Sequence, residues 1–141
     1  MSGLKAIARN KDWARLGDSF VNLAYSMAKT KAVGRPVGER VPDRVLSKAL
    51  EISKTIDVSR MTAGEKGDVV EAILAYAWSN HLISLEEAAE TLFVRVAAIN
   101  FESRSCENEG AARAFSDLLR LAVKRIRDGG LEGGETNEEG N

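Results

Sequence analysis

The stretch RLGDSFVNLAYS, residues 15–26, decides how the fold is interpreted. Gly17 and Asp18, two poor helix formers, stand together inside a segment whose apolar residues recur at helical spacing. A second such pair, Gly67 and Asp68, lies in KGDVVEAILAYAW, residues 66–78, which also has a helical pattern. Glycines remove the side chains that keep two helix backbones apart. We therefore predict that the two helices cross closely and that the two pairs meet there.

Helical periodicity extends over most of the chain, and no alternating strand pattern of useful length occurs. We predict helices at about residues 12–29, 42–54, 63–80, 85–101 and 111–127. Thr62 with Glu65, and Ser84 with Glu87, have the spacing of capping boxes at two of the helix starts. The first helix has apolar residues on two faces, with its main stripe at Trp13, Leu16, Phe20, Leu23 and Met27. The predicted fold class is all-α.

Composition indicates one compact domain, because 141 residues with 44% hydrophobic content can bury a sizeable core. We assign residues 1–130 to this domain and expect the glycine-rich, acidic residues 131–141 to be a disordered tail. No apolar run approaches the roughly 20 residues of a membrane span, and the N-terminus lacks the features of a secretory signal. The expected location is cytoplasmic, with no membrane partner. A single cysteine, Cys106, and a single histidine, His81, argue against disulfides, cysteine-rich metal sites and histidine-based hydrolases.

Basic residues concentrate in the first half of the chain. Residues 1–66 hold thirteen Lys and Arg against seven Asp and Glu, whereas residues 67–141 hold seven against fourteen. A basic face of this kind can follow the phosphates of a nucleic acid, although a solvated helix face and loop would have the same composition. The candidate phosphate contacts lie between the two glycine-aspartate pairs: Lys29, Lys31, Arg35, Arg40, Arg44 and Lys48.

Three acidic residues form the candidate catalytic and metal-binding group. Asp68 and Glu71 are three positions apart on one predicted helix, so their Cβ atoms lie about 5 to 6 Å apart on one side. Asp18 joins them if the two helices cross. Hard carboxylate oxygens suit Mg²⁺ or Mn²⁺ better than zinc. The alternative is that acidic residues near a helix N-terminus merely complement the helix dipole.

Two motifs resemble those of the ribonuclease III family. LGDSFVNLAYS, residues 16–26, is similar to the Leu-Gly-Asp signature of that family, and GDVVEAILAYAW, residues 67–78, is similar to its second acidic motif, Asp-x-x-Glu-Ala followed by aliphatic residues. SLEEAAETLF, residues 84–93, matches the continuation of the family's pattern. The order of the motifs agrees with the family, and the resemblance covers about residues 10–100.

This resemblance implies a ribonuclease III-type helical domain that hydrolyses double-stranded RNA and leaves 5′-phosphate and 3′-hydroxyl ends. By position, Asp18, Asp68 and Glu71 would be the ligands of Mg²⁺, with Mn²⁺ as a substitute. Family members also act as two-fold dimers with their active sites along one valley, so a homodimer is expected. Several aromatic residues could contribute to the contact between copies or to the core: Trp13, Phe20, Tyr25, Trp78 and Phe93.

The sequence departs from the family at one candidate ligand. Bacterial members carry a glutamate four residues before the signature aspartate, where this sequence has Ala14. Asp12, Glu65 or a water could take that place. We expect no double-stranded-RNA-binding domain after the last predicted helix, so affinity is expected to come from the catalytic domain itself. Two alternatives therefore remain open: an inactive RNA-binding relative, and a helical protein-interaction module.

Overall fold

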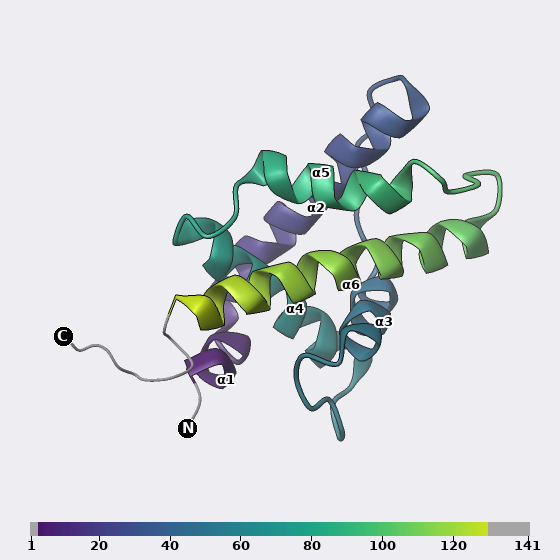
Figure 1. Ribbon diagram of the computed structural model, residues 1–141. Helices are drawn as coiled ribbons and strands as arrows, with labels where there is room; N and C mark the ends of the chain where they lie inside the picture. Colours follow the sequence, from purple (N-terminus) through teal and green to yellow (C-terminus); the bar gives the residue numbers. More distant parts are fainter. Residues whose placement is uncertain (1–2, 130–141) are drawn as a thin grey trace.

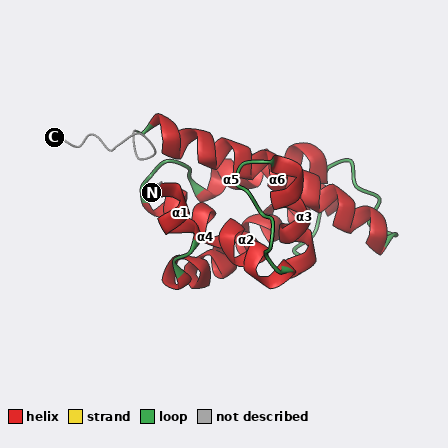
Figure 2. Cartoon of the chain, turned by 90° about the horizontal axis from the view of Figure 1, so that it is seen from below, coloured by secondary structure: helices red, strands yellow, loops and turns green. Residues whose placement is uncertain are grey.

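The computed structural model describes residues 3–129, and within this range the chain is built from helices without any strand (Figures 1 and 2). The all-α prediction is confirmed. The elements, in chain order, are α1 (Gly3–Ala8), α2 (Lys11–Val33), α3 (Asp43–Ser53), α4 (Ala63–Ser79), α5 (Leu85–Val96) and α6 (Arg104–Asp128). The predicted tail at residues 131–141 lies outside the described range.

Most helix starts follow from capping side chains. Thr62 and Glu65 form the predicted capping box at α4, and the Ser84 side chain accepts the Glu87 N–H at α5. The prediction missed α1 and placed the start of α6 at residue 111 instead of Arg104. The first turns of α6 have few apolar residues, so periodicity does not reveal where this helix begins. It begins at a cap, in which the Ser103 side chain accepts the N–H of Cys106.

The centre of the molecule is α4, against which α1, α2, α3 and α6 pack. In Figure 1, α6 runs across α4 with α5 on one side of it and α3 on the other. The predicted apolar face of α4 is buried throughout: Val69, Val70, Ile73, Leu74 and Ala77. Such burial is the main favourable term in folding, at about 1.5 to 3 kcal/mol for each large side chain.

The face that α2 buries is made largely of small residues. Ala14, Gly17, Ala24 and Ala28 are buried there, beside Phe20, Val21 and Tyr25. Two members of the predicted main stripe face outward, because Leu16 is 40% and Leu23 is 51% exposed. The prediction that this stripe is a core face was therefore partly wrong. Small side chains are selected because α2 packs very close to α4, as the surroundings of Gly17 show below.

The segment between α2 and α3 runs back along α2 and is bound to it by hydrogen bonds. Three side chains spaced one helical turn apart on α2 each accept a backbone N–H of this segment: Thr30 from Val37 over 3.0 Å, Ser26 from Glu39 over 2.9 Å, and Asn22 from Val41 over 2.7 Å. The segment is therefore fixed on α2, and α3 starts at a defined place beside it.

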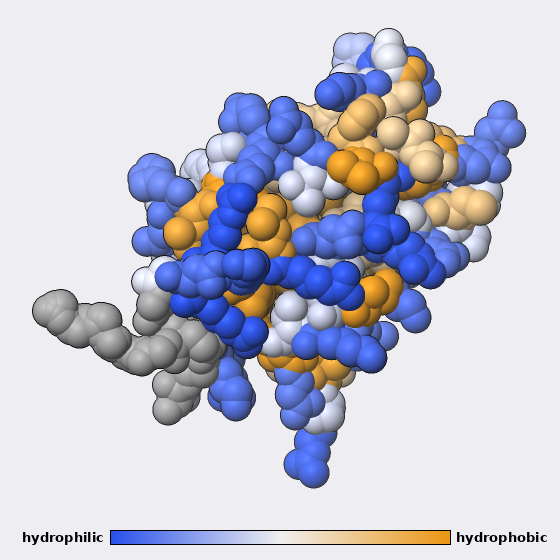
Figure 3. Space-filling view, viewed as in Figure 1, coloured by the Kyte–Doolittle hydropathy of each residue, from blue (hydrophilic) through white to orange (hydrophobic). Residues whose placement is uncertain are grey.

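The surface is mixed. Apolar patches interrupt the hydrophilic surface over α5 in the view of Figure 3, and Val94 on this helix is 74% exposed. Within residues 3–129, none of the helices combines the length and apolar character that a bilayer crossing requires.

Candidate active site

The predicted acidic residues line one cavity. Asp18 reaches it from α2, and Asp68 and Glu71 reach it from α4. The cavity has a volume of about 390 Å³, and its remaining lining residues are Lys11, Ala14, Arg15 and Asp43. Side chains far apart in the sequence are thus brought together at the contact between α2 and α4.

Gly17 allows this contact. A Cβ atom added to Gly17 would lie 1.9 Å from the carbonyl oxygen of Glu71 and 2.4 Å from its carbonyl carbon. The two helix backbones touch at this point, and Asp18 follows directly in the chain. The expected role of Gly17 agrees with this geometry.

Gly67 has a different role from the one predicted. A Cβ atom there would come no closer than 3.4 Å to any atom, and that atom is Oδ1 of Asp43 on α3. This is ordinary contact. The prediction that the two glycine-aspartate pairs meet is therefore wrong for Gly67, because Gly17 packs against the backbone of Glu71, one turn further along α4.

Glu71 is a buried carboxyl group among other carboxylates. It is 6% exposed. Burial, followed by the nearby charge of Asp18 and a hydrogen bond with it, and then by the charges of Asp68 and Asp43, raises the pKa of Glu71 to about 8. In the absence of a cation Glu71 therefore holds its proton near neutral pH. A divalent cation at this position would favour the ionised form.

The two aspartates are partly exposed, and each has a positively charged neighbour. Lys11 Nζ lies 3.1 Å from Asp68 Oδ2, and Arg40 lies 4.0 Å from Asp18 Oδ1. With the side chains placed this way, the described residues contain no ready-made cluster of three ligands for a metal ion. Exposed ion pairs of this type contribute only about 0 to 1 kcal/mol to the free energy of unfolding. The side chains of Lys11 and Arg40 can therefore move away from the aspartates at little cost.

The donor set fits a hard divalent cation. Besides Lys11, Ala14 and Arg15, the cavity is lined by carboxylates, and the buried one, Glu71, has no ion pair with a basic residue in the described part of the chain. Mg²⁺ and Mn²⁺ prefer oxygen donors of this kind. Asp18, Asp68 and Glu71 are the residues that could hold the ion.

Neither expected substitute for the missing glutamate is at the cavity. Asp12 lies on the surface, where it pairs with Arg15, and Glu65 belongs to the capping box of α4. Ala14 faces the cavity and brings no oxygen ligand. The fourth carboxylate is that of Asp43, which sequence reasoning missed. In the sequence, Asp43 is recognisable only as an acidic residue in the first turn of a helix. Such residues are common, so this position alone does not indicate a functional site.

The predicted phosphate contacts do not form one group. Lys29 is 8% exposed and pairs with Glu39 at 2.5 Å and Glu107 at 2.8 Å. Its ammonium group has no free face for a phosphate, so we correct that assignment: Lys29 holds the α2–α3 segment and α6 against α2.

The remaining basic residues are exposed in two places. Lys31 lies over the ring of Phe93 near the far end of α2, and Arg35 follows in the next loop. Arg40 lies 4.0 Å from Asp18 Oδ1, while Arg44 and Lys48 are on the outer face of α3. Arg44 and Lys48 line a hollow of about 510 Å³ that also includes Arg113 of α6.

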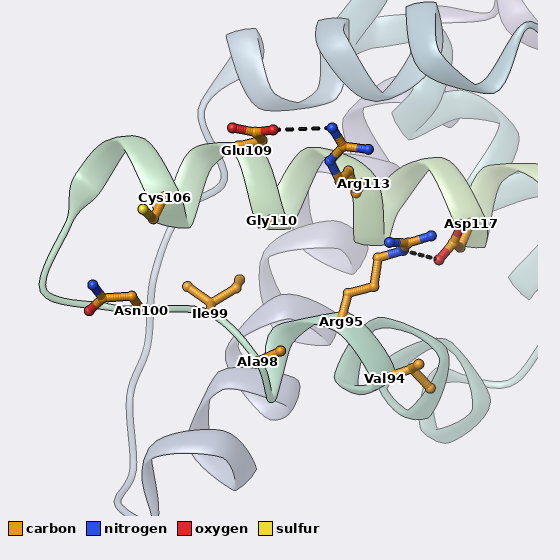
Figure 4. Close-up of a pocket in the computed structure, with 10 residues that line it drawn as sticks. All are labelled: Val94, Arg95, Ala98, Ile99, Asn100, Cys106, Glu109, Gly110, Arg113 and Asp117. Carbon is orange, nitrogen blue, oxygen red and sulfur yellow. Dashed lines mark hydrogen bonds and ion pairs between the residues drawn. The ribbon is translucent and has the colours of Figure 1, made fainter.

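A larger hollow, of about 720 Å³, lies between the end of α5 and the start of α6 (Figure 4). Its two carboxylates are both paired with arginines, Glu109 with Arg113 and Asp117 with Arg95 (Figure 4). The acidic groups of this hollow are thus neutralised, in contrast to Glu71. The hollow therefore lacks the features of the candidate site.

The structure is an all-α domain that brings carboxylates from crossing helices into one cavity. A model of the Ribonuclease III family matches residues 11–128, which include α2 to α6. The chain belongs to the ribonuclease III family. No curated protein was found to match the sequence. Membership of the family indicates an RNA-cleaving, hydrolase-type function.

Proposed function

We propose that the protein is a Mg²⁺-dependent endoribonuclease that hydrolyses double-stranded RNA and leaves 5′-phosphate and 3′-hydroxyl ends. The observation that carries the proposal is the convergence of Asp18, Asp68 and the buried Glu71 on one cavity at the α2–α4 contact. The family match over residues 11–128 agrees with it.

The proposed chemistry assigns defined roles to the chain's own residues. Asp18, Asp68 and Glu71 hold Mg²⁺ through their carboxylate oxygens. The ion would supply Lewis-acid chemistry there: it would lower the pKa of a water and offset charge on the phosphate. In the hydrolysis, the water oxygen bonds to phosphorus as the bond from phosphorus to O3′ breaks, and a proton from that water ends on O3′, which leaves as the 3′-hydroxyl. Lys11 and Arg40, displaced from the carboxylates, can then pair with RNA phosphates near the cavity mouth.

The test is incubation of the purified protein with a long RNA duplex in Mg²⁺ and, separately, in EDTA. We expect shortening of the duplex in Mg²⁺ only, with products that carry a 5′-phosphate and can be ligated. An intact duplex in both reactions contradicts the proposal. Binding without cleavage would instead identify an inactive RNA-binding relative. This is the second candidate, because Lys11 pairs with one proposed ligand, Asp68, and Ala14 brings no oxygen ligand to the cavity.

We propose that Arg40, Arg44 and Lys48 bind the phosphate backbone, and that Lys31 and Arg35 extend this contact. Double-stranded RNA is recognised through its shape and backbone, so a spread of exposed cations near the cavity is what binding requires. The Arg44→Glu, Lys48→Glu double variant should bind duplex RNA more weakly in EDTA. The slope of log affinity against log salt should fall by about 1 for each phosphate that the variant no longer neutralises.

The control for this prediction is Lys5→Glu, a charge reversal at an exposed position of α1. We expect it to leave the salt slope close to that of the wild type. An unchanged slope in the Arg44, Lys48 double variant would remove α3 from the RNA-binding surface.

We propose that two copies associate through the outward face of α2. Three large apolar side chains are partly exposed: Leu16 (40%) and Leu23 (51%) on α2, and Trp78 (40%) on α4. The ring of Trp78 lies 6.1 Å from that of Phe20 on α2, so the exposed parts of the two helices are neighbours. Exposed apolar surface of this type marks protein interfaces. A two-fold contact would use the same patch on both copies.

Leu23→Glu should weaken this association about tenfold or more, because it places a charge in an apolar interface. Sedimentation equilibrium of the wild type and the variant at micromolar concentration measures the effect. Val94→Glu is the matched control, since Val94 is 74% exposed but lies on α5. A wild type that sediments as a monomer would exclude paired cleavage by a homodimer.

A further inference from the structure

Asp43 is the first residue of α3, and its carboxyl group faces the same cavity as Asp18, Asp68 and Glu71. It makes no hydrogen bond or ion pair with any residue in the described range 3–129. Its carboxylate therefore lies beside other carboxylates without a partner of its own. Asp43 is exposed, so water screens part of the repulsion among these carboxylates, and a cation between them would remove it.

The position of Asp43 is set by contacts on two sides. On one side, Gly67 of α4 leaves room, because a Cβ there would lie 3.4 Å from Asp43 Oδ1. On the other side, the segment before α3 is bound to α2: Asn22 accepts the N–H of Val41 over 2.7 Å.

Asn22 also connects this segment to the acidic group. Its Nδ2 lies 3.5 Å from Asp18 Oδ1, while its Oδ1 accepts from Val41. One side chain of α2 thus contacts both Asp18 and the backbone that leads into α3. The placement of Asp43 near Asp18 is consequently a product of the fold and is not left to a free loop.

The cavity itself provides the second indication of a cation. Glu71 is 6% exposed, and its carboxyl group faces the cavity with acidic neighbours on α2, α3 and α4. Ala14, which also lines the cavity, has no oxygen in its side chain. The only additional carboxylate that lines this cavity in the described part of the chain is that of Asp43.

We propose that Asp43 is a fourth carboxylate ligand of the divalent cation held by Asp18, Asp68 and Glu71. This inference rests on the proposed function, since it concerns the same cation. It makes α3 part of the metal site: the ion joins α2, α3 and α4, and Asn22 and Gly67 are positioning residues that keep Asp43 within reach. The alternative role for Asp43 is stabilisation of the α3 N-terminus through the helix dipole.

The test is titration of the full chain with Mn²⁺, with bound and free ion distinguished by electron paramagnetic resonance. Asp43→Asn should lower the affinity for Mn²⁺ about tenfold or more, because an amide is a weaker ligand than a carboxylate. Asp43→Glu should recover part of the loss. Asp12→Asn removes a negative charge from the exposed start of α2 and should change the affinity less than about twofold, since exposed charges outside the cavity are screened.

The thermal midpoint gives an independent measurement. Without metal, Asp43→Asn should melt at or above the wild-type temperature, because a repulsive charge is removed, and its rise in added Mn²⁺ should be smaller than that of the wild type. A lower metal-free midpoint together with wild-type Mn²⁺ affinity would overturn the proposal in favour of the helix-dipole role.

The failure of this inference can be separated from failure of the proposed function. If Asp18→Asn loses Mn²⁺ binding while Asp43→Asn retains it, the metal site stands and Asp43 is not a ligand. If the wild type binds no Mn²⁺, both proposals are wrong.

Discussion

Gly17→Ala is expected to destabilise the protein by about 4 kcal/mol or more, which is among the largest effects of a single methyl group. Alanine normally stabilises a helix by about 1 kcal/mol relative to glycine. Here the added Cβ would lie 1.9 Å from the carbonyl oxygen of Glu71, which is backbone and cannot move away by changing a rotamer. Relief of the overlap requires α2 and α4 to separate, and both belong to the core.

Urea denaturation followed by circular dichroism measures this effect, as a fall in the unfolding midpoint at unchanged slope. Gly64→Ala is the matched control, because it lies in the first turn of α4 and the nearest atom to its added Cβ is 3.9 Å away. We expect the control to be neutral or slightly stabilised. A Gly17→Ala variant as stable as the wild type would show that α2 and α4 do not approach this closely.

Asp18→Asn is expected to lower the rate of cleavage of double-stranded RNA about a hundredfold or more while leaving RNA binding in place. The change preserves the shape of the side chain and removes the negative charge. Without metal, Glu71 holds its proton near neutral pH and shares a hydrogen bond with Asp18. The amide oxygen of asparagine can still accept that hydrogen bond, so the metal-free variant should keep nearly the stability of the wild type. Single-turnover cleavage in Mg²⁺ and duplex binding in EDTA separate the two effects.

Asp12→Asn controls for the loss of charge from α2, since Asp12 is exposed, pairs with Arg15 and does not itself line the acidic cavity. It should cleave at nearly the wild-type rate. Wild-type cleavage by Asp18→Asn would remove this residue from the catalytic machinery. Loss of both cleavage and stability would instead show that Asp18 has a structural role. That result would favour the alternative that the protein is a helical protein-interaction module.

Sequence reasoning was most successful where local chemistry decides the outcome. The capping box at Thr62 starts α4 as predicted, and the apolar face of α4 is buried as predicted. Both features depend on residues within a few positions of one another. At α5 the Ser84 side chain caps the helix, but the predicted box is incomplete because the Glu87 carboxylate pairs with Arg125. The start of α6 was misplaced because its first turns have few apolar residues and begin at the cap formed by Ser103.

The orientation of α2 could not be obtained in this way. Its larger apolar residues suggested a core stripe, yet Leu16 and Leu23 are exposed and the small residues around Gly17 are buried. Periodicity indicates that a helix has an apolar face, but how closely the neighbouring helix packs decides which face is inside.

The sequence by itself determined the all-α class, the caps and the two acidic motifs, since each is encoded by neighbouring residues. Tertiary structure alone decided that Gly17 packs against Glu71 while Gly67 lies under Asp43, and that Lys29 is buried in an ion-pair network. It also decided that Asp43 joins the acidic cavity. The physical reason is that side chains from different helices become neighbours only when the helices pack, and no local pattern records which of them will meet.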